Sequence, residues 1–230
     1  MNVDDPNVAM TETVAHALGS LKEDLVFVGG CAVGLLITDD ARPPIRATRD
    51  VDLVAEVATR VDYYALAERL RKVGFQEHIG DVNCRWRYKD LLVDVMPTDE
   101  SILGFSNGWY VHAVRQATRF DLPTGTQIRL VSPPLLVATK IEAFYGRGND
   151  DYGGSHDIED IINLVDGRPE LPEEIERSEP ELRDYLRAEI DDLLSNRSFV
   201  DTIPWHFGPD RTNQARAPVV IERLRKIAGL

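Results

Sequence analysis

Cysteine is scarce in this chain, which has only Cys31 and Cys84 among its 230 residues. Two cysteines give no sign of a disulfide framework or of a zinc site. No apolar run approaches the roughly 20 residues of a transmembrane helix. The acidic beginning, MNVDDPNVAM, also lacks the basic and then apolar order of a signal peptide. We therefore expect a protein of a reducing cytoplasm that has no membrane partner.

Positive charge is also scarce, since the formal net charge is −13. Proteins that bind nucleic acid over a broad surface are usually basic, so we expect no such surface. The negative charge is concentrated between residues 150 and 201, which hold 17 acidic residues, 5 arginines and no lysine. The rest of the chain has nearly equal numbers of acidic and basic residues, so the sequence is compatible with a local anion-binding surface there. Its arginines form two clusters, Arg42, Arg46 and Arg49, and then Arg85 and Arg87.

Three common ligand-binding motifs are missing. Gly29 and Gly30 stand between a predicted strand and a predicted helix, but Cys31 occupies the place of the second glycine in GxGxxG. No Gly-Lys-Ser/Thr follows, as a P-loop requires, and no EF-hand calcium loop is present. Paired glycines at such a turn still let backbone amides approach a phosphate. A tight strand-to-helix turn needs glycine in any case, so both interpretations stay open.

The composition, with 43% hydrophobic and 28% charged residues, is that of an ordinary globular protein. Hydrophobic patterning predicts an α/β domain over residues 1–132 and a helical region over residues 133–230. The elements predicted for the first part are a helix at 7–21, a strand at 25–28, a helix at 31–37, a strand from 50, a helix at 61–73, a hairpin of 84–88 with 91–95, and strands within 109–131. Those predicted for the second part are helices at 134–145, 156–167, 172–195 and 214–228.

Three aspartates carry the strongest chemical signal. Asp50 and Asp52 alternate with Val51 at the start of a strand, so their side chains project to the same side. Asp94 is embedded in the apolar strand LLVDVM. Neighbouring carboxylates repel unless a cation neutralises them, and Mg²⁺ prefers such oxygen ligands. The alternative is that Asp50 caps the loop and Asp94 is a partly exposed edge residue.

A second group lies in the helical part. Lys140 stands inside the apolar segment LLVATKIEAF, and Asp157 and Asp160 share one face of the next predicted helix. The lysine would reach phosphates, or else it would form a structural ion pair between two helices. Arg147 would contact phosphate or be solvated, and His156 is interpreted as a solvated or capping residue.

Trp86 lies between Arg85 and Arg87 in the predicted hairpin. Alternation along a strand puts both arginines on the side opposite the tryptophan. The indole would then stack on a base or, as is more common for tryptophan, belong to the core.

These motifs occur in a fixed order: Gly-Gly, Arg-x-Thr-Arg-Asp-Val-Asp-Leu, LLVDVMP, an isolated lysine and then HDIED. Over roughly residues 20–168 the chain resembles the nucleotidyltransferases of the DNA polymerase β-like superfamily. Within that superfamily it resembles the abortive-infection toxins of the AbiEii/AbiGii type. The resemblance implies an α+β fold, in which a mixed β-sheet of the nucleotidyltransferase type is flanked by helices and is followed by an α-helical C-terminal half.

The resemblance also assigns roles to residues. Asp50, Asp52 and Asp94 correspond to the catalytic carboxylates that bind the metal, which implies Mg²⁺ as cofactor. Asp157 corresponds to the acid of the last motif, a base or positioning residue.

Four residues are expected to bind the nucleotide. Gly29 and Gly30 correspond to the phosphate-binding turn, and Lys140 to the lysine that holds the nucleotide. We add Arg49, from the arginine-rich run that precedes the first aspartate.

The function that the resemblance implies is Mg²⁺-dependent transfer of an NMP from an NTP to a hydroxyl acceptor, with release of pyrophosphate. The acceptor would be RNA, a protein or a small molecule, and a toxin role would require an antitoxin protein as partner. One alternative is an aminoglycoside-type antibiotic nucleotidyltransferase, because an acidic helical half suits a cationic acceptor. The other is a nucleotide-binding or interaction module of the same fold without turnover.

Overall fold

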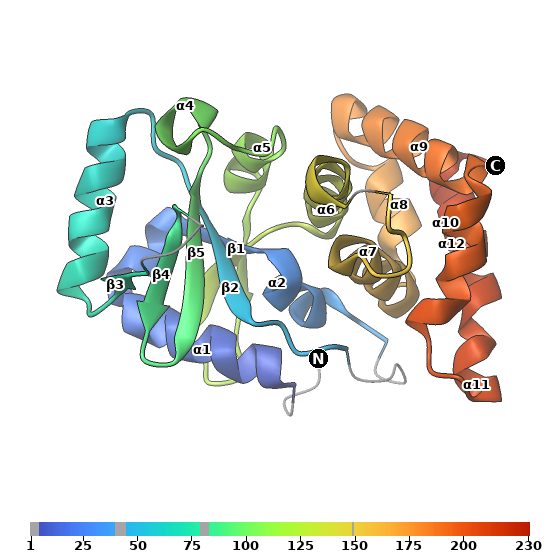
Figure 1. The fold of residues 1–230 in the computed structure, drawn as a ribbon, viewed down its shortest axis with the longest axis horizontal. Coiled ribbons are helices and arrows are strands. Elements are labelled where there is room, and N and C mark those ends of the chain that lie inside the picture. Colours follow the sequence, from blue (N-terminus) through green and yellow to red (C-terminus); the bar gives the residue numbers. More distant parts are fainter. Residues whose placement is uncertain (1–4, 40–44, 79–82, 149) are drawn as a thin grey trace. The chain divides into compact units, whose positions relative to one another are not determined.

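The computed structural model describes residues 5–39, 45–78, 83–148 and 150–230. The chain divides into two compact units. The first consists of Met1–Leu35 and Pro44–Ser132, and the second of Leu36–Pro43 and Pro133–Leu230. The strands belong to the first unit, whereas the second is helical (Figure 1). This arrangement confirms the α+β class with a helical C-terminal half.

The first unit is built on a mixed sheet with seven strands among the described residues. They are β1 (Leu25–Val28), β2 (Asp50–Ala55), β3 (Gln76–Glu77), β4 (Arg85–Tyr88), β5 (Leu91–Pro97), β6 (Thr118–Asp121) and β7 (Gln127–Leu130). Their spatial order is β3-β4-β5-β2-β1-β7-β6. The β2–β5 and β1–β7 pairs are parallel and the other pairs are antiparallel. The central strands β2 and β5 lie side by side (Figure 1).

Helices and a 3₁₀ turn accompany this sheet. They are α1 (Pro6–Leu18), η1 (Gly19–Asp24), α2 (Gly29–Leu36), α3 (Arg60–Lys72), α4 (Glu100–Leu103) and α5 (Tyr110–Arg115). Asp5 caps α1 by accepting a hydrogen bond from the backbone N–H of Asn7. Gly74, at φ +95°, follows the end of α3, as the sequence predicts.

The predicted hairpin is confirmed, with β4 and β5 joined by Lys89 and Asp90. Lys89 takes the left-handed conformation at φ 53° that tight hairpin turns require. A two-residue turn fixes the register, and Arg85 therefore lies directly opposite Asp94.

Two predictions for this unit are wrong in detail. Residues 110–115 form helix α5 rather than a strand, because the buried Trp109, Ala113 and Val114 recur at helical spacing. Gly29 and Gly30 are the first residues of α2 rather than a separate turn before it. The Pro43-Pro44 pair, on which the predicted loop break depends, lies outside the described residues.

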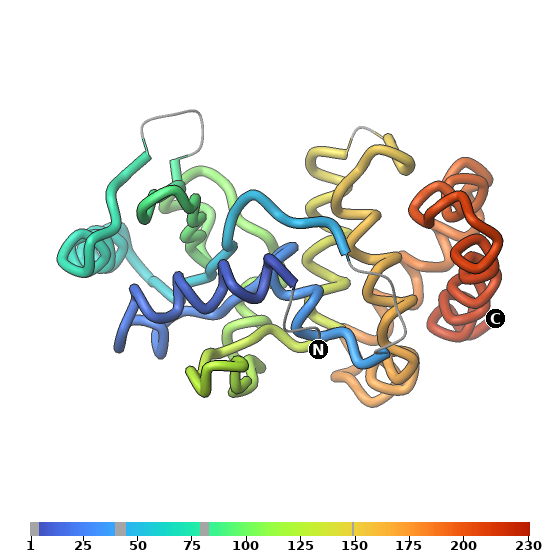
Figure 2. The backbone as a smooth tube through the Cα atoms, turned by 90° about the horizontal axis from the view of Figure 1, so that it is seen from below, coloured from blue at the N-terminus to red at the C-terminus, as the bar shows by residue number. Residues whose placement is uncertain are grey.

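The second unit contains α6 (Pro133–Arg147), α7 (His156–Gly167), α8 (Leu171–Glu176), α9 (Pro180–Ser195), α10 (Arg197–Thr202), η2 (Ile203–His206), α11 (Arg211–Gln214) and α12 (Arg216–Ala228). Ser155 caps α7 as predicted, since its hydroxyl accepts from the backbone N–H of Ile158. Helices α6 and α7 run side by side (Figures 1 and 2). Within the described part of the chain, no helix combines the length and apolarity that a membrane crossing needs.

Candidate functional site

Sheet register brings the three predicted carboxylates together in the first unit. Asp52 is the direct partner of Asp94 on the parallel neighbour β5 and of Val28 on β1. Paired residues in a sheet project to the same side, and so do residues two apart, which adds Asp50 to the group. We call Asp50, Asp52 and Asp94 the acidic row. It lies where β1 passes into α2.

The alternative for Asp94 as an exposed edge residue is wrong. Strand β5 is flanked by β4 and β2, and Asp94 is only 7% exposed. A buried carboxylate is costly unless it is paired, and its partner is Arg85.

Arg85 binds two of the three carboxylates. Its Nε and Nη2 atoms donate to Oδ1 and Oδ2 of Asp94, at 2.8 and 2.7 Å. The same Nη2 also donates to Oδ2 of Asp50, at 2.9 Å. The hydrogen bonds to Asp94 raise the pKa of the Arg85 guanidinium further above its already high ordinary value. Two of the three carboxylates of the acidic row therefore bind a permanent positive charge.

A buried asparagine on α1 positions the start of β2. The side chain of Asn7 donates to the carbonyl of Arg46 at 3.0 Å and accepts from the backbone N–H of Thr48 at 2.7 Å. The hydroxyl of Thr48 then donates to Oδ1 of Asp50, at 3.3 Å. Asp50 is thus oriented by Thr48 on one side and Arg85 on the other.

Gly29 makes room for the central carboxylate of the row. Its φ is +68°, and a Cβ atom placed on it would lie 1.8 Å from Oδ2 of Asp52. Any other residue would clash with that carboxylate and would also be strained in the left-handed region. The first residue of α2 and Asp52 therefore occupy adjacent space, which puts the helix N-terminus beside the acidic row.

The pKa of the buried thiol of Cys84 is affected by the acidic row. Burial, followed by the charges of Asp94 and Asp52, raises the pKa of Cys84 to about 12. The negative charges of the row therefore act on Cys84, the residue that precedes β4.

The donor chemistry of the acidic row fits a hard divalent cation, because three carboxylates from two adjacent strands share one side of the sheet. Among the described residues, no three His, Cys, Asp or Glu side chains stand in the arrangement of a metal ion's ligands. The arrangement observed is one in which Asp50 and Asp94 bind the guanidinium of Arg85.

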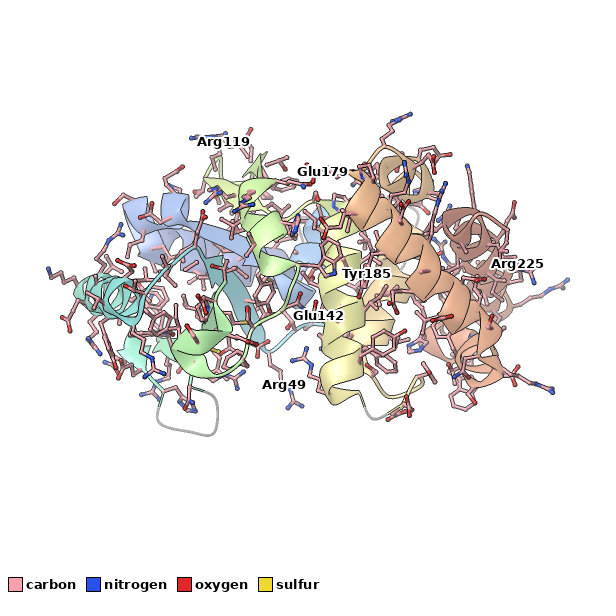
Figure 3. The ribbon with its side chains drawn as sticks, turned by 90° about the horizontal axis from the view of Figure 1, so that it is seen from above. Arg49, Arg119, Glu142, Glu179, Tyr185 and Arg225 are labelled. Atoms are coloured by element: carbon pink, nitrogen blue, oxygen red, sulfur yellow. The ribbon has the colours of Figure 1, made fainter. Side chains whose placement is uncertain are left out.

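Two other residues predicted to bind nucleotide, Gly30 and Arg49, are chain neighbours of Gly29 and Asp50. Gly30 is buried in the first turn of α2. Arg49 immediately precedes β2, is exposed, and extends outward (Figure 3).

The second unit holds a buried ionic cluster between α6 and α7. Nζ of Lys140 lies 3.1 Å from Oδ1 of Asp157 and 2.6 Å from Oδ2 of Asp160. Arg147 donates to Asp157 through Nε and Nη2, both at 2.9 Å. Burial raises the pKa of Asp157, but the bonds from Arg147 and Lys140 outweigh burial and hold it below its ordinary value. The lysine and both predicted acids of this part are thus brought together.

Other predictions have mixed outcomes. Trp86 is 3% exposed and belongs to the core, so the base-stacking interpretation is wrong. His156 is largely exposed and lies 3.3 Å from Glu159, in agreement with the prediction of a solvated residue. Arg147 is also largely exposed, but it is bound to Asp157 rather than merely solvated.

Sequence reasoning missed the contacts of Arg85 with the acidic row and the roles of Thr48 and Asn7. The hairpin register was a sufficient signal for Arg85, because a two-residue turn at Lys89-Asp90 places it opposite Asp94. No local pattern reveals the clamp by Asn7, whose contacts span about 40 residues of sequence.

Comparisons with known proteins add a remote likeness in structure. A scan against protein-family models finds no match, and a search of curated proteins finds none either. Among solved structures, the chain is similar to the antibiotic-resistance factor ANT(2'')-Ia, described by its solution structure and substrate-regulated conformation dynamics. The match has a TM-score of 0.43 at 17% identity, and covers 81% of this chain and 94% of the other. The functional proposal below rests on the residues of the site.

Proposed function

We propose that this protein is a Mg²⁺-dependent nucleotidyltransferase that moves an NMP from an NTP to a hydroxyl acceptor and releases pyrophosphate. The observation that carries the proposal is the acidic row, because its three carboxylates share one side of two adjacent strands beside the first residue of α2. Carboxylate oxygens are the ligands that a metal at a triphosphate requires.

Each group of the first unit has a role in this proposal. Asp50, Asp52 and Asp94 would hold the metal, which when bound neutralises triphosphate charge and favours ionisation of the attacking hydroxyl. The backbone N–H groups at Gly29 and Gly30 begin an eight-residue helix, whose N-terminus favours an anion such as phosphate.

The proposed reaction is the transfer of a nucleotidyl group with pyrophosphate as the leaving group. The acceptor oxygen forms a bond to the α-phosphorus of the NTP, and the bond from that phosphorus to the pyrophosphate oxygen breaks. Pyrophosphate leaves with the electron pair, and the acceptor's proton passes to a base. Asp157 as that base and Lys140 as a nucleotide ligand stay predictions from the sequence.

The finer identity of the reaction is part of the same proposal. The acceptor is a hydroxyl of RNA, of a protein or of a small molecule, and a toxin role would need an antitoxin partner. Incubation with α-labelled NTP and each acceptor class distinguishes these options by which class becomes labelled.

The first experiment is a thermal-shift panel with each of the four NTPs, with and without Mg²⁺. A ligand that binds only the native state raises stability, by about 2.7 kcal/mol at a hundredfold excess over Kd. We expect a Mg²⁺-dependent shift with at least one NTP.

Two variants make the panel specific. Asp52→Asn should lose the Mg²⁺-dependent shift, whereas Asp90→Asn, an exposed carboxylate in the hairpin turn, should retain it. A full Mg²⁺-dependent shift in Asp52→Asn would contradict the metal assignment. A shift that is independent of Mg²⁺ and is not followed by label transfer would favour the nucleotide-binding module.

A further inference from the structure

One guanidinium binds two of the three carboxylates of the acidic row. Nη2 of Arg85 donates to Asp50 and Asp94 at once, while Nε completes a two-point contact with Asp94. The Arg85 and Asp94 side chains are only 22% and 10% exposed, respectively. Charges at this depth lose hydration and need compensation, and bidentate contacts to a carboxylate are the strongest form of it.

The position of Arg85 is fixed by the backbone rather than by a flexible loop. Arg85 and Asp94 are cross-strand partners in the hairpin, and Asp94 is in turn the partner of Asp52 on β2. Three carboxylates this close would repel one another in the absence of a cation. The hairpin therefore carries its own counter-charge to the row.

A divalent cation bound to the same carboxylate oxygens would lie close to the positive charge of Arg85. Both oxygens of Asp94 and one oxygen of Asp50 are engaged by Arg85. Two cations that share these oxygens repel each other at short range, where little water screens them. A metal ion and the guanidinium therefore favour alternate occupation of the two carboxylates.

We propose that Arg85 is the counter-ion of the metal-free site and competes with the divalent cation for Asp50 and Asp94. The inference rests on the proposed function, because that function supplies the metal. Arg85 then has two measurable effects: it stabilises the row without metal, and it lowers the affinity of the row for metal. Its role is that of a positioning residue.

The test measures binding of Mn²⁺ alone, by the EPR signal of the free ion, without nucleotide. Arg85→Gln should bind Mn²⁺ more tightly than the wild type, on the order of tenfold for the loss of one charged bidentate contact. Arg87→Gln is the matched control, since Arg87 is an exposed arginine on the same strand and the same side of the sheet. It should bind Mn²⁺ as the wild type does.

Thermal melting of the same proteins provides a readout that does not depend on turnover. Without metal, Arg85→Gln should melt below the wild type, and Mn²⁺ should raise its melting temperature more than that of the wild type. Arg85→Lys keeps the charge but loses the two-point contact. It should lie between the two in Mn²⁺ affinity, and it replaces Arg85→Gln in the test if that variant does not fold.

The outcomes separate the two proposals. Mn²⁺ binding that is lost in Asp52→Asn but equal or weaker in Arg85→Gln overturns the competition and leaves the metal site standing. An absence of Mn²⁺ binding in every protein, Arg85→Gln included, overturns both. Tighter binding in Arg85→Gln that is abolished by adding Asp52→Asn supports both.

Discussion

Two features require glycine at position 29: its left-handed backbone conformation and the close approach of the Asp52 side chain. We expect Gly29→Ala to destabilise the protein by more than the roughly 1–2 kcal/mol that the left-handed conformation costs an alanine, because its Cβ also meets Asp52. Urea unfolding measures the difference. Gly125→Ala is the control, since its φ is +81° and a Cβ there meets nothing within 4 Å. Equal losses in the two variants would contradict the close approach of Asp52.

The thiol of Cys84 should be inert in the native protein. Its pKa of about 12 follows from burial and from the charges of Asp94 and Asp52, so almost no thiolate is present at pH 8. We expect an aromatic disulfide reagent to label neither Cys84 nor the buried Cys31 on the timescale of minutes. Both should react at once in denaturant. Rapid native labelling at Cys84 would show that the site is open to solvent.

The acids of the site are predictable from local pattern, whereas their counter-charge is not. Alternation along β2 identifies Asp50 and Asp52, and an apolar context identifies Asp94. Arg85 required one further step, from turn length to hairpin register. Asn7 could not be found this way, because it acts on residues 46–48 through long-range contacts.

At the scale of elements, a buried lysine links helices α6 and α7. Lys140→Met leaves Asp157 and Asp160 buried with less compensation, and we expect a loss of about 3 kcal/mol in urea unfolding. The double variant Lys140→Met/Asp160→Asn should recover part of it. Nucleotide affinity separates the two interpretations of Lys140. An unaltered affinity in the folded double variant would leave the lysine a purely structural role.

The same pair should be sensitive to acid through Asp157. Because its folded pKa lies below the ordinary 3.8, its contribution is present above pH 3.8 and is lost as the pH falls through the folded value. The groups that face it are Lys140 and Arg147. We expect the stability difference between the wild type and Asp157→Asn to be largest near neutral pH and to shrink below pH 3.8. A difference that is constant down to pH 2 would contradict the lowered pKa.

Elements with strong periodicity were predicted well and ambiguous ones were not. The strand at 25–28, helix α3, the hairpin and α7 follow from alternation, helical spacing and capping residues. Helix α5 was missed because its short apolar pattern fits a strand as well as a helix, and packing of Trp109 and Ala113 decides it.

At the scale of the whole molecule, the chain enters the second unit twice. Residues 36–39 of the segment Leu36–Pro43 are bound within that unit. The backbone N–H groups of Thr38 and Asp39 donate to the carbonyl of Gly167, and Arg168 donates to the carbonyl of Leu36. The change of pattern near residue 132 was visible in the sequence. The place of residues 36–39 in the second unit was not visible, because their bonding partners are distant in sequence and no local feature marks them.

The place of residues 36–39 in the second unit has a consequence for folding during synthesis. The strand that carries Asp50 and Asp52 leaves the ribosome soon after residues 36–39, yet the bonds of those residues to Arg168 and Glu170 close loops of 132 residues. Closing so long a loop is slow, and it must wait for the C-terminal part of the chain to be synthesised. Residues 36–39 therefore reach their final place only late in folding.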